Sequence, residues 1–389
     1  MLTKHDLRYH WRSIKFFSDF GYYPLQMDPK SNRIWIQRNI CKRFLHCFHV
    51  LTWASYTLMV FYRMGEIFSR KEEHMLMQLA CPVACIGLSL MAMTAHTCMF
   101  FVRPQFYIHG FNRILDYLRG IGRQCQTTAR PRHELFAIFM VHLNVFMPVA
   151  HTMSFLCFPE GPNFIYYNVP EEKKTPLVFI ACASFEFYIF GLWSVTGAFL
   201  LFIGVLNIHM SLEQMNEGIV DTKSISLQGI KGAEAFALIE KQCKNCRELQ
   251  LAIQEVNRAY SFLVFVARIY FLYECILCSF SGIRMFNDSV GLGISFLIFA
   301  LNSMIMYVLT FERAFKIPVK MEEYKLSIKE SAGVCLGGGF LTSVIFRMVD
   351  SIPCVAIKVG SFNSMERASP IIFFHFIVSG VVNLLLAFK

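Results

Sequence analysis

Residues 379–389, SGVVNLLLAFK, end an apolar run that begins near residue 369, and this run decides the class of the fold. A bilayer core about 30 Å thick is crossed by about 20 mostly apolar residues in a helix, because a helix satisfies its own backbone hydrogen bonds in lipid. Residues 369–388 have that length and contain few polar side chains, among them Ser379 and Asn383. The run therefore predicts a membrane-spanning helix.

The composition of the whole chain agrees with this interpretation. Of its 389 residues, 55% are hydrophobic and 16% are charged, whereas about 25% of residues are charged in a typical soluble protein. Six further apolar runs of suitable length lie at about residues 44–66, 75–102, 134–158, 177–208, 259–283 and 290–311. The sequence therefore predicts an all-α membrane protein with seven transmembrane helices.

The distribution of lysine and arginine predicts the orientation in the membrane. Basic residues are frequent in residues 1–43 and in every second connection between the runs, and rare in the other connections. Because basic loops stay in the cytoplasm, we expect a cytoplasmic amino terminus, retained without a cleavable signal peptide, and an extracellular carboxyl terminus. The glycosylation sequon at residues 287–289 falls in a connection expected outside. The net charge of +10 forms no basic patch, so nucleic acid is not an expected partner.

The cytoplasmic side is expected to carry more than linkers. Residues 217–232 are polar with Gly and Ser and predict a loop, whereas apolar residues at three- and four-residue spacing from Ile239 to Tyr260 predict a helix that continues into the fifth run. A further cytoplasmic helical segment contains Gly337–Gly339, which are expected to mark either a bend or close helix packing. We expect one seven-helix domain over residues 1–389, made of a cytoplasmic leader (1–43), spans one to six (44–311), the cytoplasmic helix of an anchor (312–358) and a last helix (369–388).

The fourteen cysteines lie mostly inside apolar runs, where Cys behaves as a small hydrophobe, and we expect few or no disulfides. Cys243 and Cys246 have the CxxC spacing of some metal and redox sites. Both lie on the apolar stripe of a predicted helix, with no second pair or His at suitable spacing. Packing is the favoured interpretation, and we expect no metal and no cofactor.

Three charged residues stand out within the predicted spans, namely Glu186, Arg268 and Glu274, and His151 is a milder case. A charged side chain in a span costs about 2.5–3.5 kcal/mol on insertion scales, so such residues usually face an interior or a water-filled cavity. Arg268 either forms the floor of an outward-opening ligand cavity or pairs with a carboxylate to hold the bundle together. The candidate ligand-binding residues are His151, Phe155, Glu186, Tyr188, Trp193, Tyr270, Tyr273 and Glu274.

The last helix carries one polar face. Ser379, Val382, Asn383 and Leu386 share it by their three- and four-residue spacing. This face either hydrogen-bonds to a neighbouring helix or lines water. If several copies surround an axis, Asn383 forms a polar ring, and Val382 or Leu386 forms a constriction that gates by dewetting.

The closing residues 352–389, IPCVAIKVGSFNSMERASPIIFFHFIVSGVVNLLLAFK, resemble the arthropod gustatory and odorant receptor superfamily. Gly360 and Phe362 match a Gly and a Phe in the short link before the last helix, and Phe388 matches the terminal Phe. Gly380 and Val381 stand where Thr-Tyr is typical, and Ala387 replaces a Gln.

The resemblance implies a tetrameric ligand-gated cation channel in the plasma membrane of sensory neurons. Such receptors have an intracellular anchor domain, one pore lined by the last helix of each subunit, and a ligand pocket in the outer half of each subunit. The expected partners are a small-molecule ligand, membrane lipid and related receptor subunits in a homotetramer or heterotetramer. The charged residues near the expected pocket favour a tastant; an odorant receptor-like subunit is the alternative.

Other classes of membrane protein fit the sequence less well. A G-protein-coupled receptor needs an extracellular amino terminus, and the chain has neither Asp-Arg-Tyr after the third run nor Asn-Pro-x-x-Tyr in the seventh. A transporter often shows repeated halves, and a metalloenzyme needs clustered His or acidic ligands. The sequence shows neither pattern, so we expect a receptor channel that is not an enzyme.

Overall fold

The computed structural model describes residues 15–28, 33–70, 75–102, 104–121, 148–149, 151–157, 159–161, 164–286, 290–361, 363–365 and 369–387. The long helices are α2 (Ile40–Arg70), α3 (Met75–Thr97), α4 (Pro104–Ile121), α6 (Pro176–Leu227), α7 (Gly232–Met285), α8 (Val290–Phe311), α9 (Ile317–Leu336), α10 (Phe340–Asp350) and α11 (Ser369–Ala387). Short helical turns are η1 (Cys98–Val102, a π-helix), η2 (Ile165–Asn168), η3 (Glu171–Lys173) and η4 (Ala314–Lys316). Two small hairpins join β1 (Leu25–Met27) to β2 (Ile34–Ile36) and β3 (Lys358–Val359) to β4 (Asn363–Ser364).

The apolar runs of the sequence correspond to helices. Runs one, two, four, five, six and seven lie in α2, α3 with η1, α6, α7, α8 and α11. Among the described residues, four helices are long and apolar enough to cross a membrane: Ile40–Ser69, Pro82–Val102, Gly232–Met285 and Ser369–Ala387. Most of the third run and the sequon at 287–289 lie outside the described residues. The chain thus has the helices of a membrane protein, and the count of seven spans and the orientation stay predictions.

The chain divides into two compact units. Unit 1 comprises Gly204–Phe265 and Val308–Ile372, and unit 2 comprises Leu2–Ile203, Val266–Tyr307 and Phe373–Lys389. Helices α6 and α7 have 52 and 54 residues and contribute to both units. At 1.5 Å per residue, each is about 80 Å long, well beyond the roughly 30 Å of a bilayer core.

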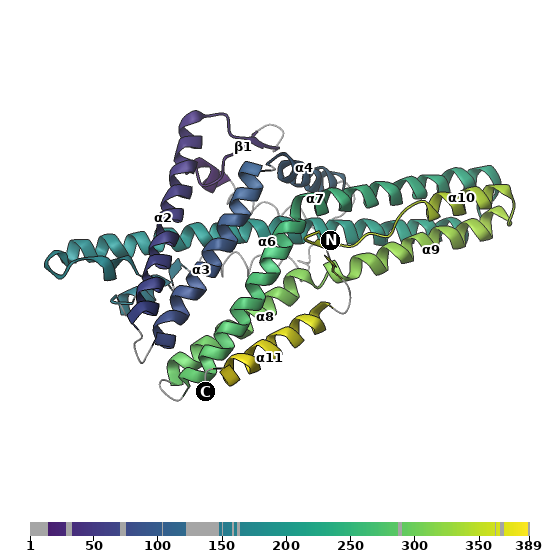
Figure 1. Cartoon of the computed structure of the whole chain (residues 1–389). Coiled ribbons are helices and arrows are strands. Elements are labelled where there is room, and N and C mark those ends of the chain that lie inside the picture. The colour runs from purple at the N-terminus through teal and green to yellow at the C-terminus, as the bar shows by residue number, and fades with distance from the viewer. Residues whose placement is uncertain are drawn as a thin grey trace. The chain divides into compact units, whose positions relative to one another are not determined.

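Unit 1 is a helical bundle that includes the first part of α7 together with α9 and the shorter α10, which Figure 1 labels. The predicted apolar stripe of α7 is confirmed as the buried face, with Ile239 and Ile253 at 0% and 1% exposure. On α9 the hydroxyl of Tyr324 donates to the side-chain oxygen of Gln242 at 2.7 Å, and burial raises the pKa of this tyrosine. The unit therefore has a close-packed interior of its own.

The CxxC pair belongs to this packing. Cys243 and Cys246 are 2% and 0% exposed, and the Cys246 sulfur lies 3.9 Å from that of Met321. Within the described part of the chain, no group of three His, Cys, Asp or Glu side chains could hold a metal ion. The twelve cysteines whose side chains the structure describes are free thiols.

The loop predicted for residues 217–232 is wrong for most of its length. Helix α6 continues to Leu227, and only the short turn that follows separates it from α7. Gly218 does not break the helix, because the ring of Tyr324 packs directly against it. Ser224 and Ser226 bond back to carbonyls three residues earlier in the helix, so their hydroxyl groups are satisfied there.

The bend at Gly337–Gly339 is confirmed. Gly337 and Gly338 have φ angles of 66° and 76°, and this left-handed conformation ends α9 before α10 begins. The segment after α10 is fastened to α7 by Asn257. Its side-chain oxygen accepts from the Lys358 N–H, and its amide group donates to the Ala356 carbonyl, both at 2.8 Å.

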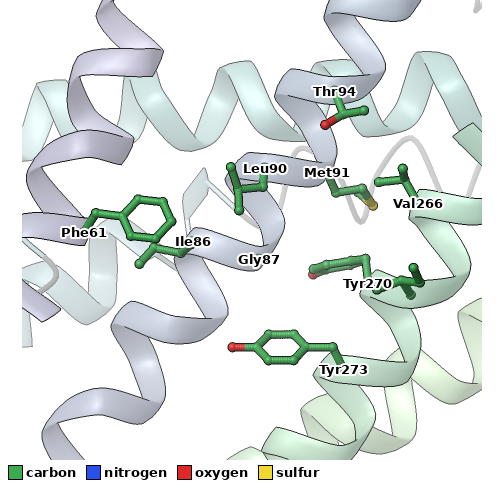
Figure 2. Close-up of a pocket in the computed structure, with 10 residues that line it drawn as sticks. Phe61, Ile86, Gly87, Leu90, Met91, Thr94, Val266, Tyr270 and Tyr273 are labelled. Atoms are coloured by element: carbon green, nitrogen blue, oxygen red, sulfur yellow. The ribbon is translucent and has the colours of Figure 1, made fainter. Parts of the chain in front are cut away.

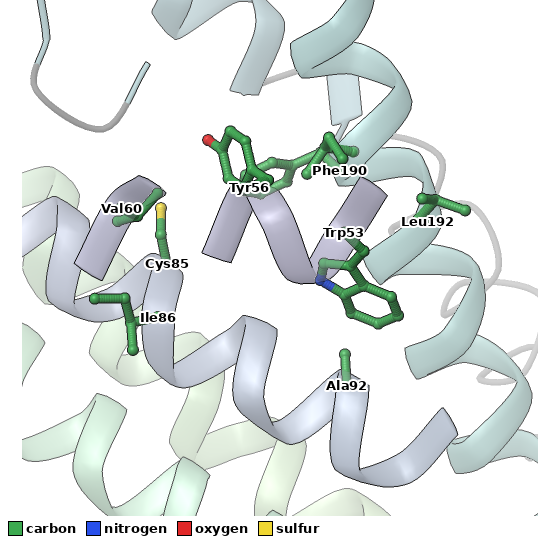
Figure 3. Packing of buried hydrophobic residues seen from close by; sticks show 9 residues of the cluster. Trp53, Tyr56, Val60, Cys85, Ile86, Ala92, Phe190 and Leu192 are labelled. Atoms are coloured by element: carbon green, nitrogen blue, oxygen red, sulfur yellow. The ribbon is translucent and has the colours of Figure 1, made fainter. Parts of the chain in front are cut away.

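Unit 2 has its core where α2, α3 and α6 meet, as Figure 3 shows. Trp53 and Tyr56 of α2 are 2% and 3% exposed and pack with Cys85 of α3 and Phe190 of α6. The indole N–H of Trp53 donates to the Ser89 hydroxyl at 2.8 Å, which satisfies the buried polar end of the ring.

The leader forms structure that the sequence did not predict. The amide of Asn112 on α4 donates to the Ile34 carbonyl at 3.0 Å, and its oxygen accepts from the Ile34 N–H at 2.9 Å. This pair of bonds fastens the β1–β2 hairpin to α4. The strands have only three residues each, too few to produce a recognisable alternation in the sequence.

Candidate functional site

Glu186 of α6 lies at the centre of a buried hydrogen-bond cluster. Its side chain is 0% exposed. One carboxylate oxygen accepts from the Ile165 backbone N–H at 2.9 Å. The other accepts from the Tyr56 hydroxyl and from Nε2 of His151, each at 3.0 Å. Protein groups thus bind both oxygens, and Glu186 joins α2, α6, η2 and the helical stretch at 151–157.

Aromatic rings surround this cluster. The His151 ring stacks on Phe190 with the ring centres 3.5 Å apart. Phe155 is 0% exposed and contacts the rings of Phe164, Tyr166 and Phe179. These residues form one packed layer around Glu186.

Tyr188 faces a different set of neighbours. Its hydroxyl bonds to Nδ1 of His49 on α2, and the ring of His49 stacks on Tyr22 at 4.6 Å. Trp193 is in α6, and its side chain lies outside what the structure describes.

A cavity of about 370 Å³ lies between α3 and α7, with one residue of α2 at its edge. Figure 2 shows Tyr270 and Tyr273 projecting from α7 toward α3. The lining residues are Phe61, Ile86, Gly87, Leu90, Met91, Thr94, Val266, Ile269, Tyr270 and Tyr273. Its volume is near the lower end of the about 300–1,000 Å³ typical of small-molecule sites.

Gly87 lets the ring of Tyr273 lie directly against α3. A Cβ atom at this position would be 3.0 Å from the Tyr273 ring. The Tyr273 hydroxyl donates to the Val83 carbonyl at 3.3 Å, which bridges α7 to α3. A side chain at position 87 would therefore push on the Tyr273 ring, which forms part of the cavity wall.

Glu274 lies behind the cavity and not in its lining. The side chains of Tyr270 and of Ser303 on α8 lie near its carboxyl group. One turn further along α8, Tyr307 stacks on Phe373 of α11 with ring centres 3.7 Å apart. Arg268 of α7 lies near Tyr307.

The last helix, α11, has one buried side. Phe373 and Ile377 are 1% and 7% exposed, whereas Val382 and Leu386 are 47% and 59% exposed. The four residues of the predicted polar face, Ser379, Val382, Asn383 and Leu386, turn away from this buried side. Next to the buried side, Gly380 lies against Ile276 of α7, and a Cβ atom there would be 2.6 Å from the isoleucine side chain.

The eight residues predicted for one ligand site are therefore divided. His151, Phe155 and Glu186 form the buried cluster, Tyr188 contacts α2, and Tyr270 and Tyr273 line the cavity with Glu274 behind them. Sequence reasoning missed the α3 wall. Its residues 86, 87, 90, 91 and 94 follow helical spacing, a pattern that could have grouped them on one face.

Comparisons with known proteins match the fold and not the sequence. The chain matches no protein-family model and no curated protein sequence. Two solved structures of the insect olfactory receptor OR5 from Machilis hrabei are similar in fold. The structure in complex with eugenol has a TM-score of 0.67 at 9% identity, over 98% of this chain and 99% of that one. The other has a TM-score of 0.56 at 10% identity, over 98% of each chain. Over nearly its whole length, the chain therefore has the fold of an insect olfactory receptor, as its closing residues suggested.

Proposed function

We propose that the chain is a subunit of a chemosensory receptor: a non-selective cation channel that a small external molecule opens. The observation that carries this proposal is the fold shared with an olfactory receptor along 98% of the chain. The exposed polar face of α11 supports it, since this helix is only 11% buried within the single chain. Further subunits around a common axis would cover it. A tetramer, of one chain or of related chains, is the assembly that we propose.

The pore of this assembly would be lined by Ser379, Val382, Asn383 and Leu386. Asn383 would present a ring of amide groups to permeating ions, and Val382 and Leu386 would form the constriction that closes by dewetting. Ligand binding opens such a channel only by the difference between its affinities for the open and closed states.

The chemical class of the ligand depends on which side chains are free to contact it. A tastant was expected because of the charged residues near the pocket. Both oxygens of Glu186 are bound by protein donors, so this carboxylate does not support a polar ligand. The lining of the cavity between α3 and α7 instead favours the second candidate, an odorant receptor-like channel.

The direct test is whole-cell recording from cells that express the chain, with G-protein signalling blocked, during a screen of sugars, bitter compounds and volatiles. We expect a rapid cation current in the plasma membrane. A response that needs second messengers would contradict the channel proposal.

The pore assignment has its own test. Val382→Ala and replacement of Asn383 should change ion selectivity or resting leak. Val381→Ala is the matched control, because Val381 directly precedes Val382 and therefore points about 100° around the α11 axis from it, away from the polar face. If both pore variants carry currents like those of the wild type, α11 does not line the pore as proposed.

The orientation is tested by an epitope tag appended to Lys389. We expect antibodies to reach it on intact cells, as an extracellular carboxyl terminus requires. Detection only after permeabilisation would overturn the proposed topology. The plasma membrane of a sensory neuron is the proposed location.

A further inference from the structure

The leader ends in a hairpin that is held firmly against α4, yet two of its large apolar side chains are exposed. Ile34 of β2 is 1% exposed, and both of its backbone polar groups bond to Asn112. The next two residues, Trp35 and Ile36, are 52% and 39% exposed. Because the strand that carries them is fastened, this exposure belongs to the fold and not to a loose chain end. An exposed apolar surface of this kind often marks a place where something binds.

The exposed apolar surface continues into the first turns of α2. Ile40 and Phe44 lie one turn apart and are 80% and 76% exposed. Phe48 and Leu51 extend the same side of the helix and are 53% and 66% exposed. The stretch of α2 that is apolar enough to cross a membrane begins at Ile40 itself. The hairpin therefore comes just before the point at which α2 would enter the bilayer.

Basic side chains are interspersed with these apolar ones. Four of them follow one another in residues 33–43, namely Arg33, Arg38, Lys42 and Arg43. Arg33 pairs with Asp116 at 2.8 Å, and Lys42 pairs with Asp19 at 2.9 Å. The other two, Arg38 and Arg43, are exposed, and within the described part of the chain neither side chain is paired with a carboxylate. Two positive charges thus remain for a partner outside the chain.

The turn between β2 and α2 holds these residues in place. The Gln37 N–H donates to the Pro24 carbonyl at 2.8 Å, and the Gln37 side-chain oxygen accepts from the Asn39 N–H at 3.0 Å. The side-chain oxygen of Asn39 accepts from the Cys41 N–H at 2.9 Å, which caps the start of α2. Since Asn39 caps this end of the helix, an anion here would be bound by arginine side chains.

The combination of a tryptophan, aliphatic side chains and unpaired arginines fits a lipid surface. Tryptophan is enriched where hydrocarbon meets lipid headgroups, and long basic side chains near helix ends extend to the headgroups. The cytoplasmic leaflet contains anionic lipids, which attract basic segments next to a span. A soluble protein partner fits less well, because it would have to displace lipid from Ile40 and Phe44 at the start of the apolar stretch.

We propose that a leader patch binds anionic lipids of the cytoplasmic leaflet. The patch is made of Trp35, Ile36, Arg38, Ile40, Arg43 and Phe44. Arg38 and Arg43 contact the anionic headgroups, and Trp35 lies at the level of the headgroups. Because Asn112 fastens the hairpin to α4, the same contact holds α4 near the membrane surface. This inference goes beyond the proposed function and requires only the orientation proposed above.

Lipid selectivity is tested by native mass spectrometry of the full chain released from nanodiscs. The discs contain equal parts of phosphatidylserine and phosphatidylcholine with identical acyl chains. We expect the wild type to retain phosphatidylserine in preference to phosphatidylcholine. A basic residue near a membrane surface strengthens binding to anionic lipid about fivefold, so the double variant Arg38→Gln with Arg43→Gln should lower this preference about thirtyfold.

The matched control is the double variant Lys223→Gln with Lys231→Gln. It removes the same amount of charge from exposed positions near the end of α6 and in the turn that follows, within unit 1. This control should retain phosphatidylserine like the wild type. Equal retention of the two lipids by the wild type would overturn the site. The same loss of preference in both double variants would also overturn it, because net charge alone would then explain the binding.

The position of Trp35 is tested by tryptophan fluorescence in nanodiscs made with phosphatidylcholine brominated on its acyl chains. The difference between the wild type and Trp35→Phe isolates the emission of this residue, and gel filtration checks that the variant is folded. We expect bromine to quench the difference signal and aqueous iodide to have little effect. Quenching by iodide alone would place Trp35 in water and overturn the proposal. A tag on Lys389 that is reached only after permeabilisation would place the patch at the other leaflet and would also overturn it.

Discussion

Replacing Glu186 by Gln separates a structural role of this residue from a role in ligand binding. The carboxylate accepts three hydrogen bonds at 2.9–3.0 Å, from Tyr56, His151 and the backbone of Ile165. A glutamine keeps one acceptor oxygen and places an NH₂ group against a donor. At least one bond to a charged group is lost, worth about 1.5–3 kcal/mol, and a buried donor is left unpaired at about 1–3 kcal/mol more.

We therefore expect Glu186→Gln to lower the free energy of unfolding by about 3 kcal/mol, within the range of about 3–5 kcal/mol for breaking a buried pair. At about 2–4 °C per kcal/mol for a compact unit of this size, the Tm should fall by about 6–12 °C. The assay is thermal denaturation of the detergent-solubilised chain at one fixed heating rate, followed by gel filtration.

The matched control is Glu171→Gln. Glu171 pairs with Lys174 at the surface with its side chain 86% exposed, and Lys174 keeps its bonds to Glu160. Such exposed pairs contribute about 0–1 kcal/mol, so the Tm should change by no more than a few degrees. An unchanged Tm for Glu186→Gln, together with a shifted ligand dose response, would refute the structural role and return Glu186 to the ligand site.

Two further substitutions test the packing of unit 1. Gly218→Ala should destabilise the chain by about 1–3 kcal/mol, because the new methyl group overlaps the buried ring of Tyr324. The double variant Gly218→Ala with Tyr324→Leu should recover part of this lost stability in the same thermal assay. If the double variant recovers none of it, the contact between Gly218 and Tyr324 is not the cause. Asn257→Ala removes two hydrogen bonds to the backbone at Ala356 and Lys358 and should cost about 1–3 kcal/mol. Hydrogen exchange at residues 356–360 should rise with it, and unchanged protection there would contradict the role of this side chain.

The long helices could be predicted from the sequence because burial in lipid and in a helical bundle both produce strong patterns. The sixth apolar run, 290–311, has the bounds of α8, and the stripe from Ile239 to Tyr260 continues through α7 as expected. Residues 217–232 show the limit of this reasoning. Their Gly and Ser content is typical of loops, yet Ile219, Thr222 and Ile225 are buried on one side of α6, and this packing overrides the weak propensities.

The candidate site was harder to predict because hydropathy places residues by depth and says nothing about rotation around a helix axis. Glu186 and Glu274 were both recognised as unusual within spans. Depth alone could not reveal that one is surrounded by donors from other elements while the other stands behind a cavity wall. The partner of Glu186 in the backbone at Ile165 comes from a short turn that has no sequence signal of its own.

The contact of Gly380 with Ile276 has a consequence for how such a channel could change over generations. With no side chain at position 380, the backbone of α11 lies directly against the side chain of Ile276 on α7, and α11 is only 11% buried within the chain. Adding a single methyl group would push the helices apart by a few tenths of an ångström or more without altering the ligand or the ions that pass. A receptor could in this way become more or less excitable while its chemical preference stayed the same.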